Sequence, residues 1–330
     1  MCKTIIALKK PQKNLFWFIP YALLRSVAMA RRADAVHLSD AVLAVIGFAV
    51  WRFSHRTIFM TVHGLDLTYA QQNRVYALYL RLFLNKHEWR YICNSRATER
   101  IARQFGLVHT TVIPPGFDGQ THKESLPPRN KARAWLAQQV DRPLDDVVVL
   151  LTVGRLVPRK GVGWFIQQVL PRLEANVLYL VVGAGTDRPR LEHAISGQGL
   201  SHRALLLGQL PAASLQLVYA ASDIFVMPTI AVPADIEGFG IVGLEAAASA
   251  LPVVASRLGG ISDAIADKRN GLLVAPSDVS AFLDVLQALI TDVDYRQSLG
   301  RQAQEFTVHR YSWNAMAERY HTYFSQGVLR

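Results

Sequence analysis

The chain has 330 residues, 51% of them hydrophobic and 18% charged, which excludes a disordered or fibrous class and provides ample core material. Because this length exceeds the usual limit of a single hydrophobic core, two domains are the first expectation. The only cysteines, Cys2 and Cys93, provide neither a disulfide framework nor a cysteine metal cluster, which suits a reducing cytoplasm.

The net charge of +11 is unevenly distributed along the chain. Residues 1–142 contain 21 Lys and Arg against 8 Asp and Glu, or +13, whereas residues 143–330 contain 15 against 17, or −2. This asymmetry indicates an anionic partner for one domain. Aromatic residues such as Trp17 and Phe53 favour an anionic membrane surface, and the basic half has no recognisable nucleic-acid-binding motif. A solvated basic face without a partner is the alternative.

The first part of the chain alternates short apolar strands with helices, and its expected helices are Phe16–Arg32, Ala41–Phe53, Thr68–Asn85 and Ser95–Phe105. The expected strands are Thr4–Leu8, Ala35–Leu38, Thr57–Val62, Trp89–Cys93 and Thr111–Ile113. This order predicts a parallel sheet with helices on both faces. Ligands of such sheets bind beyond the carboxyl ends of the strands. The segments to inspect are therefore His63-Gly64-Leu65-Asp66, Asn94-Ser95 and Pro114–Asp118.

A polar segment over residues 119–143 predicts a linker and an opening helix, after which the alternation resumes. The expected strands are Val147–Val153, Val177–Val182, Ala204–Leu207 and Ile224–Met227, and the short segments Pro252–Ser256, Ile261–Ala266 and Gly271–Val274 come later. The expected helices are Gly163–Leu173, Arg188–Gln198, Ala212–Ala221, Ser280–Asp292, Asp294–Phe306 and Trp313–Phe324. The pattern predicts two doubly wound α/β domains in tandem, residues 1–142 and 143–310, followed by a final helical segment over 311–330.

Glu237 and Glu245 lie on either side of a glycine-bracketed turn, and a helix is expected to begin near Ile241. The amides of Phe239, Gly240 and Ile241 would then be unpaired donors, which favour an anion. Carboxylates on either side can accept hydroxyl groups, so a ligand with phosphates between two hydroxyl-rich ends fits, as in a nucleotide sugar. The alternative is a surface turn with two solvated glutamates.

A second candidate loop, Gly154–Gly161, follows a strand and contains Arg155 and Lys160. These two fixed positive charges can converge on a diphosphate, unless they are ordinary solvated charges. His63 also follows a strand, although a lone histidine there is more often packed or capped. Asp66 can cap the next helix. No cluster of His, Cys, Asp and Glu has metal-ligand spacing in the sequence.

In their order, these segments resemble retaining glycosyltransferases of family 4, whose GT-B architecture consists of two facing Rossmann-like domains with mostly parallel sheets. The similarity covers roughly residues 30–325, and its segments are His63–Asp66, Asn94-Ser95, Ile113–Asp118, Gly154–Gly161, Val182–Gly185, Ala221–Pro228, Glu237–Glu245, Pro252–Ser256 and Leu258–Gly260. The resemblance implies transfer of a hexose from a UDP- or GDP-linked sugar, with no cofactor and no required metal. With the basic charge of residues 1–142, it predicts a cytoplasmic enzyme, peripheral at the inner face of the membrane, that acts on a lipid-linked or cell-envelope glycan.

The resemblance also implies residue roles. Arg155 and Lys160 would bind the diphosphate, Glu245 the ribose hydroxyls and Glu237 the sugar hydroxyls. His63 would reach the sugar near the reacting carbon, and residues 311–330 would form a crossover helix that packs back on the N-terminal domain. The remaining donor candidates are the amides of Gly238, Phe239, Gly240 and Ile241 and the segment around Leu210, which would flank the base. Candidates for acceptor-side or structural roles are Asp66, Asn94, Ser95 and Asp118.

One departure from the family pattern concerns the start of the chain. Only about 34 residues precede the segment that matches Ala35–Ser39, and the first glycine is Gly47. The glycine-rich loop that family members place near the donor phosphates is therefore missing. Either the first domain is abbreviated or the start is incomplete. The alternative function is a non-catalytic or partner-dependent GT-B module that binds a nucleotide sugar.

Overall fold

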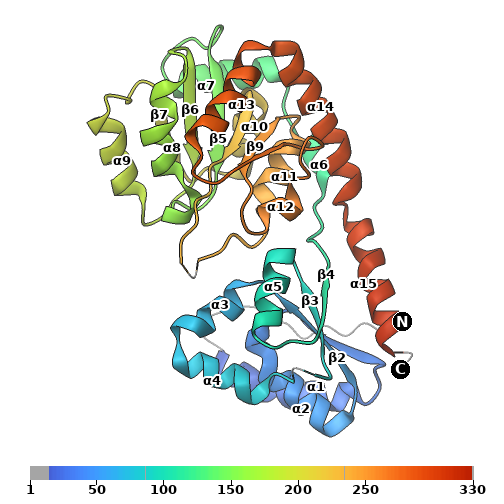
Figure 1. Cartoon of the computed structure of the whole chain (residues 1–330). Helices are drawn as coiled ribbons and strands as arrows, with labels where there is room; N and C mark the ends of the chain where they lie inside the picture. Colours follow the sequence, from blue (N-terminus) through green and yellow to red (C-terminus); the bar gives the residue numbers. More distant parts are fainter. Residues whose placement is uncertain (1–14, 86, 234, 329–330) are drawn as a thin grey trace. The chain divides into compact units, whose positions relative to one another are not determined.

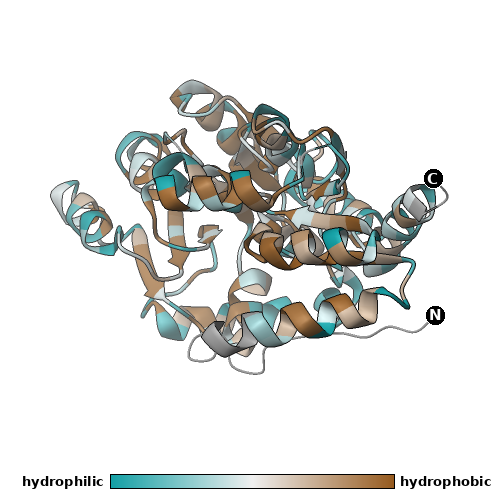
Figure 2. Ribbon diagram, turned by 90° about the horizontal axis from the view of Figure 1, so that it is seen from below, coloured by the Kyte–Doolittle hydropathy of each residue, from teal (hydrophilic) through white to brown (hydrophobic). Residues whose placement is uncertain are grey.

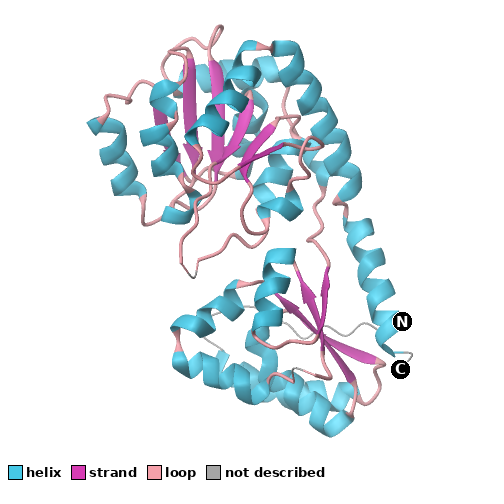
Figure 3. Ribbon diagram, viewed as in Figure 1, coloured by secondary structure: helices cyan, strands magenta, loops and turns pink. Residues whose placement is uncertain are grey.

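The computed structural model describes residues 15–85, 87–233 and 235–328. They form two compact units, each built on its own parallel sheet (Figures 1 and 3). Unit 1 holds the described residues up to Ile113 and those from Ala317 onward, and unit 2 holds Pro114–Met316. The predicted fold class, two Rossmann-like α/β units, is confirmed. Across the described residues, no helix has the length and hydrophobicity required to cross a bilayer.

The sheet of unit 1 has the order β1-β2-β3-β4, and all its strands are parallel. Its strands are β1 (Ala35–Leu38), β2 (Thr57–Val62), β3 (Arg90–Cys93) and β4 (His109–Val112). The helices that precede and connect them are α1 (Leu15–Ala30), α2 (Ala44–Ser54), α3 (Leu65–Gln72), α4 (Arg74–Phe83) and α5 (Arg96–Gln104). In Figure 2, hydrophobic and hydrophilic residues alternate along many helices, as expected where only one face of a helix packs inward.

The last helix, α15 (Trp313–Val328), covers one face of the unit 1 sheet. Ile58, Met60 and Val62 of β2 join the main core of the unit, so the residues between them point to the opposite face. There Phe59 packs on Phe324 of α15, with 4.6 Å between ring centroids. The aromatic side chains of α15 thus complete the second hydrophobic face of unit 1.

The sheet of unit 2 has the order β10-β9-β8-β5-β6-β7, again with all strands parallel. Its strands are β5 (Val148–Val153), β6 (Val177–Val182), β7 (Ala204–Gly208), β8 (Ile224–Met227), β9 (Val253–Ser256) and β10 (Leu272–Val274). Because β6 and β7 extend to one side of β5 while β8 lies on its other side, the strand order reverses between β5 and β8. Such a switch point is where doubly wound sheets bind ligands.

The helices of unit 2 cover both faces of this sheet. Val149 and Leu151 belong to one hydrophobic cluster, whereas Val148 and Leu150 belong to the other, so β5 is buried on both sides. The helices are α6 (Gly119–Glu124), α7 (Arg129–Gln139), α8 (Val162–Gln168), α9 (Arg188–Gly197), α10 (Ala212–Ala221), α11 (Ile241–Ala248), α12 (Ile261–Ala264), α13 (Val279–Thr291) and α14 (Val293–Arg310).

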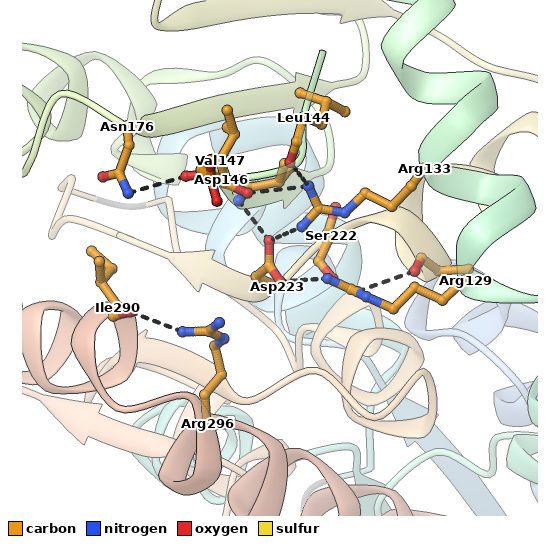
Figure 4. A network of polar contacts seen from close by, with 12 residues as sticks. Arg129, Arg133, Leu144, Asp146, Val147, Asn176, Ser222, Asp223, Ile290 and Arg296 are labelled. Atoms are coloured by element: carbon orange, nitrogen blue, oxygen red, sulfur yellow. Dashed lines mark hydrogen bonds and ion pairs between the residues drawn. The ribbon is translucent and has the colours of Figure 1, made fainter.

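The division between the units falls at Ile113 and not at the expected residue 142, because α7 is bound to unit 2 (Figure 4). Asp223 is the anchor. Each of its two carboxylate oxygens accepts a hydrogen bond of 2.5 Å from a guanidinium group, one from Arg129 and the other from Arg133 of α7. Asp223 also accepts the Val149 amide at 2.8 Å. The segment expected to be a linker is therefore part of the second unit.

Most expected elements match the structure within a few residues, and two differ for clear reasons. The helix expected over Thr68–Asn85 is two helices, because the side chain of Asn73 accepts the Tyr76 amide and begins α4 anew. The helix expected over Gly163–Leu173 ends as an α-helix at Gln168, just before the 3-10 turn that contains Pro171. The expected strand Thr4–Leu8 lies outside the described residues.

Candidate functional site

Two loops meet where the strand order of unit 2 reverses. The first, residues 154–161, follows β5, and the second, residues 228–240, follows β8. The Ile230 amide donates to the Arg159 carbonyl at 2.9 Å. Gly161 has a φ of +69°, and a Cβ built there would lie 1.8 Å from the Pro228 carbonyl oxygen. Only glycine can therefore bring these loops so close.

A charged cluster joins the two loops. Glu237 is buried at 8% exposure, and its Oε2 lies 2.7 Å from Lys160 Nζ. Arg159, also buried, pairs with the same Glu237 oxygen, and its Nε lies 2.8 Å from Asp235 Oδ1. Two carboxylates thus balance two cations, which limits the cost of burying charge.

Arg159 and Asp235 are site residues that sequence reasoning missed. Arg159 stands beside Lys160 in a loop rich in charge, so it reads as a solvated side chain. The one sequence signal for Arg159 is its place in the loop that follows β5, two residues before Gly161. Its 4% exposure and its two carboxylate partners instead make it the anchor of Glu237.

The predicted helix start at Ile241 is confirmed, since α11 begins there. Gly240 precedes it with a φ of +87°, and no side chain caps this end. Phe239 is 4% exposed and packs on Tyr311, with 6.1 Å between ring centroids. The side chain of Phe239 is therefore core, so any contact of this residue with a ligand must come from its backbone amide.

Glu245 lies in the second turn of α11 and is half-buried. The hydroxyl of Tyr219 donates to its Oε2 at 2.8 Å. Arg155 is exposed, and within the described part of the chain it has no ion pair. Leu210 follows β7 and packs on the edge of a core cluster. The structure thus brings Lys160 and Glu237 into contact, whereas within its described residues no hydrogen bond or ion pair joins Arg155, Leu210 or Glu245 to this pair.

The glycines after β6 hold the first loop in place. Gly183 has a φ of +144°, and a Cβ built on it would lie 1.8 Å from the Gly154 carbonyl oxygen. The Leu156 amide donates to the Ala184 carbonyl at 2.9 Å. The Gly183-Ala184-Gly185 segment is thus a close backbone support for the loop that contains Arg155 and Lys160.

In unit 1, His63 follows β2 and is exposed. Its Nε2 lies 2.9 Å from the Ser39 carbonyl oxygen, and a carbonyl only accepts, so Nε2 carries the proton. Its backbone amide donates to both oxygens of Asp66 at 3.2 Å. Burial raises the pKa of Asp66 above its ordinary value. Asp66 thus fixes the backbone of His63, and the Nδ1 atom of a neutral His63 is left as an acceptor.

The remaining acceptor-side candidates have structural partners. Ser95 caps α5 by accepting the Thr98 amide at 3.1 Å, and Asn94 accepts the Thr98 hydroxyl at 2.7 Å. Asp118 belongs to unit 2 and caps α6, where it accepts an amide three residues on at 3.1 Å. Helix capping accounts for Ser95 and Asp118. Among the described residues, no group of three or more His, Cys, Asp or Glu is arranged to hold a metal ion.

Comparisons with known families match both parts of the chain. Residues 4–120 match the model described as Glycosyltransferase Family 4, and residues 147–292 match the model described as Glycosyl transferases group 1. Among solved structures, Anabaena Alr3699/HepE in complex with UDP has a TM-score of 0.76 and 23% sequence identity, with 92% of this chain and 82% of that chain covered.

Curated relatives are glycosyltransferases. The chain is 30% identical over 288 residues to a GDP-mannose-dependent alpha-(1-6)-phosphatidylinositol monomannoside mannosyltransferase of Mycolicibacterium smegmatis. The aligned region covers 84% of this chain and 72% of the relative. It is 32% identical over 238 residues to a D-inositol 3-phosphate glycosyltransferase of Xylanimonas cellulosilytica, which covers 70% of this chain and 55% of the relative. The chain thus spans between about half and three-quarters of the length of these two proteins.

Proposed function

Because the chain belongs to glycosyltransferase family 4 and has the GT-B fold, we propose that it transfers a hexose from a UDP- or GDP-linked sugar to a lipid-linked or cell-envelope glycan. The observation that carries the proposal is the ion pair of Lys160 with Glu237 at the switch point of unit 2. A cation suited to a diphosphate and a carboxylate suited to sugar hydroxyls stand side by side there. The Mycolicibacterium relative makes GDP-mannose the first donor to test.

In this proposal, Arg155 and Lys160 bind the diphosphate together with the backbone amides of residues 238–241. Glu237 accepts hydroxyls of the transferred sugar, and Glu245 accepts those of the ribose. The cations and the start of α11 stabilise the negative charge of the departing nucleoside diphosphate, so the proposed reaction requires no metal ion. Leu210 flanks the base.

The acceptor hydroxyl attacks the anomeric carbon from the side on which the diphosphate departs, and the configuration is therefore retained. The bond from that carbon to the diphosphate oxygen breaks as the new glycosidic bond forms, and the departing phosphate takes the acceptor's proton. His63, held by Ser39 and Asp66, contacts the transferred sugar. Retention predicts that the anomeric proton of the product has the same configuration as in the donor, which NMR of the product measures.

The proposal is tested first by thermal shift with UDP, GDP, ADP and their sugars, because a ligand of the folded state must raise the melting temperature. Release of the nucleoside diphosphate from each sugar nucleotide is then measured with the wild type, Arg155→Ala and Glu245→Ala. Turnover by the wild type and weaker binding by both variants are expected. Binding without turnover would support the non-catalytic module instead, and absence of any nucleotide binding would refute both functions.

We also propose that unit 1 docks peripherally on an anionic membrane at the cytoplasmic face. Helix α4 exposes Val75, Leu78 and Leu82 to solvent at 80%, 56% and 60%, at the spacing of a single helical stripe. Arg74 and Arg81 on the same helix are exposed as well. An apolar stripe beside arginines matches the acyl region and the anionic headgroups of a bilayer surface.

Cosedimentation with vesicles of phosphatidylcholine, with and without phosphatidylglycerol, tests this surface. The triple variant Val75→Ser, Leu78→Ser, Leu82→Ser is expected to remain in the supernatant, whereas the wild type binds the anionic vesicles in a salt-sensitive manner. Val293 and Tyr295, exposed apolar residues of unit 2, provide the matched control when both are changed to serine. Equal sedimentation of the wild type and the triple variant would refute docking through α4.

A further inference from the structure

Side chains from α10, from α6 and from the C-cap of α11 form a hydrogen-bonded group around Glu245. Tyr219 of α10 donates its hydroxyl to Glu245 Oε2 at 2.8 Å. Ser249, which follows the last residue of α11, donates to the main-chain carbonyl of Glu245 at 2.8 Å, and His122 of α6 places its Nε2 2.8 Å from the Ser249 hydroxyl oxygen. Both the backbone and the side chain of Glu245 are therefore held from outside its own helical turn.

Tyr219 is the best fixed member of this group. It is 1% exposed, and its ring packs edge-to-face on His122 with 5.7 Å between centroids. Burial raises the pKa of the phenol well above its ordinary value, and the carboxylate of Glu245 raises it further. The hydroxyl therefore stays protonated at neutral pH and acts as a donor to the carboxylate.

We propose that Tyr219 is a positioning residue for the ribose of the bound nucleotide. Its hydroxyl occupies one oxygen of Glu245 and fixes the plane of the carboxylate, so that the other oxygen is oriented for the ribose hydroxyls. Within the part of the chain that the structure describes, this is the only hydrogen bond to the Glu245 carboxylate. The inference rests on the proposed function, which assigns the ribose to Glu245.

The test compares ligands with and without ribose hydroxyls. Isothermal titration calorimetry of the full chain measures the Kd of GDP, UDP and their 2′,3′-dideoxy analogues. Tyr219→Phe removes only the hydroxyl, and Tyr179→Phe is the matched control, because Tyr179 is also buried and donates to Thr152 in the same unit. For the wild type, the Kd of the nucleotide with ribose hydroxyls is expected to be lower than that of its dideoxy analogue by about tenfold or more. Hydrogen bonds to a charged group can provide a difference of this size.

Tyr219→Phe is expected to lose most of this preference while the Kd of the dideoxy analogue stays the same, and Tyr179→Phe is expected to keep the preference. If Tyr219 has a structural role alone, Tyr219→Phe will weaken binding of the ribose and dideoxy nucleotides equally, and that result would overturn the inference. An unchanged preference in Tyr219→Phe would also overturn it and leave the proposed function intact. Failure of the wild type to bind any nucleotide would overturn the proposed function, and the inference with it.

Discussion

Lys160 and Glu237 form an ion pair of 2.7 Å across two loops that follow neighbouring strands of unit 2. Arg159 holds the same carboxylate, so Glu237 has a second cationic partner besides Lys160. In the proposed function, donor binding would exchange the carboxylate for the diphosphate as the partner of Lys160, and Glu237 would then accept hydroxyls of the sugar.

Replacement of Glu237 by glutamine is expected to separate nucleotide binding from sugar transfer. The neutral side chain releases Lys160, so the affinity for GDP or UDP should stay the same or increase. The transfer rate should fall by about tenfold to a hundredfold, because a charged acceptor of sugar hydroxyls is lost. Calorimetry and steady-state kinetics measure the two effects. Glu192→Gln, in an exposed pair of the same unit, is the control.

The ion pair also predicts that substitutions at Lys160 and Glu237 are not additive. Lys160→Gln should weaken binding of the nucleoside diphosphate more in the Glu237→Gln background than in the wild type, because the carboxylate no longer neutralises the lysine. A double-mutant cycle on the Kd values measures this coupling. Strictly additive effects would show that Glu237 does not compete with the phosphates for Lys160.

The stability of unit 2 is expected to depend on pH through His122. Burial lowers the pKa of His122 below its ordinary value of 6.5. At pH values between the lowered pKa of the folded protein and 6.5, the unfolded chain binds more protons than the folded protein. The free energy of unfolding therefore increases with pH in this range and levels off above 6.5. Urea unfolding at pH 5, 6 and 7.5 should show a weaker dependence for His122→Gln. Equal dependence in both proteins would contradict this.

Asp223 is expected to be a strong determinant of stability, since it is 6% exposed and bound by Arg129 and Arg133. Asp223→Ala leaves two guanidinium groups without their carboxylate and should cost about 3 kcal/mol of unfolding free energy. Asp267→Ala breaks the more exposed pair with Arg257 and should cost about 1 kcal/mol or less. Urea denaturation measures both, and similar losses would refute the role of burial.

The sequence predicts the strands of the structure well, because most of them are short apolar runs followed by glycine, proline or a polar residue. The candidate loops after β5 and β8 are also predictable, since ligands bind beyond strand ends. The contact of Lys160 with Glu237 is not predictable from either loop alone. It depends on β8 lying beside β5, a property of the sheet order that no local pattern records.

The errors have similar physical causes. A polar segment with two prolines precedes α7 and reads locally as a linker, yet Arg129 and Arg133 bind Asp223, which comes much later in the chain. Asn73 is a polar residue of a type common on helix surfaces, but its side chain caps the start of a new helix. In each case a partner in space decides the structure, and sequence spacing does not reveal that partner.

The packing of α15 on unit 1 has a consequence for biosynthesis. Unit 1 lacks part of its second hydrophobic face until Phe324 reaches Phe59, and Phe324 is among the last described residues to leave the ribosome. Unit 2, contiguous from Pro114 to Met316, is translated before that segment and can fold first. The strands of unit 1 are thus synthesised before unit 2, yet their second hydrophobic face is completed only after unit 2 has been translated.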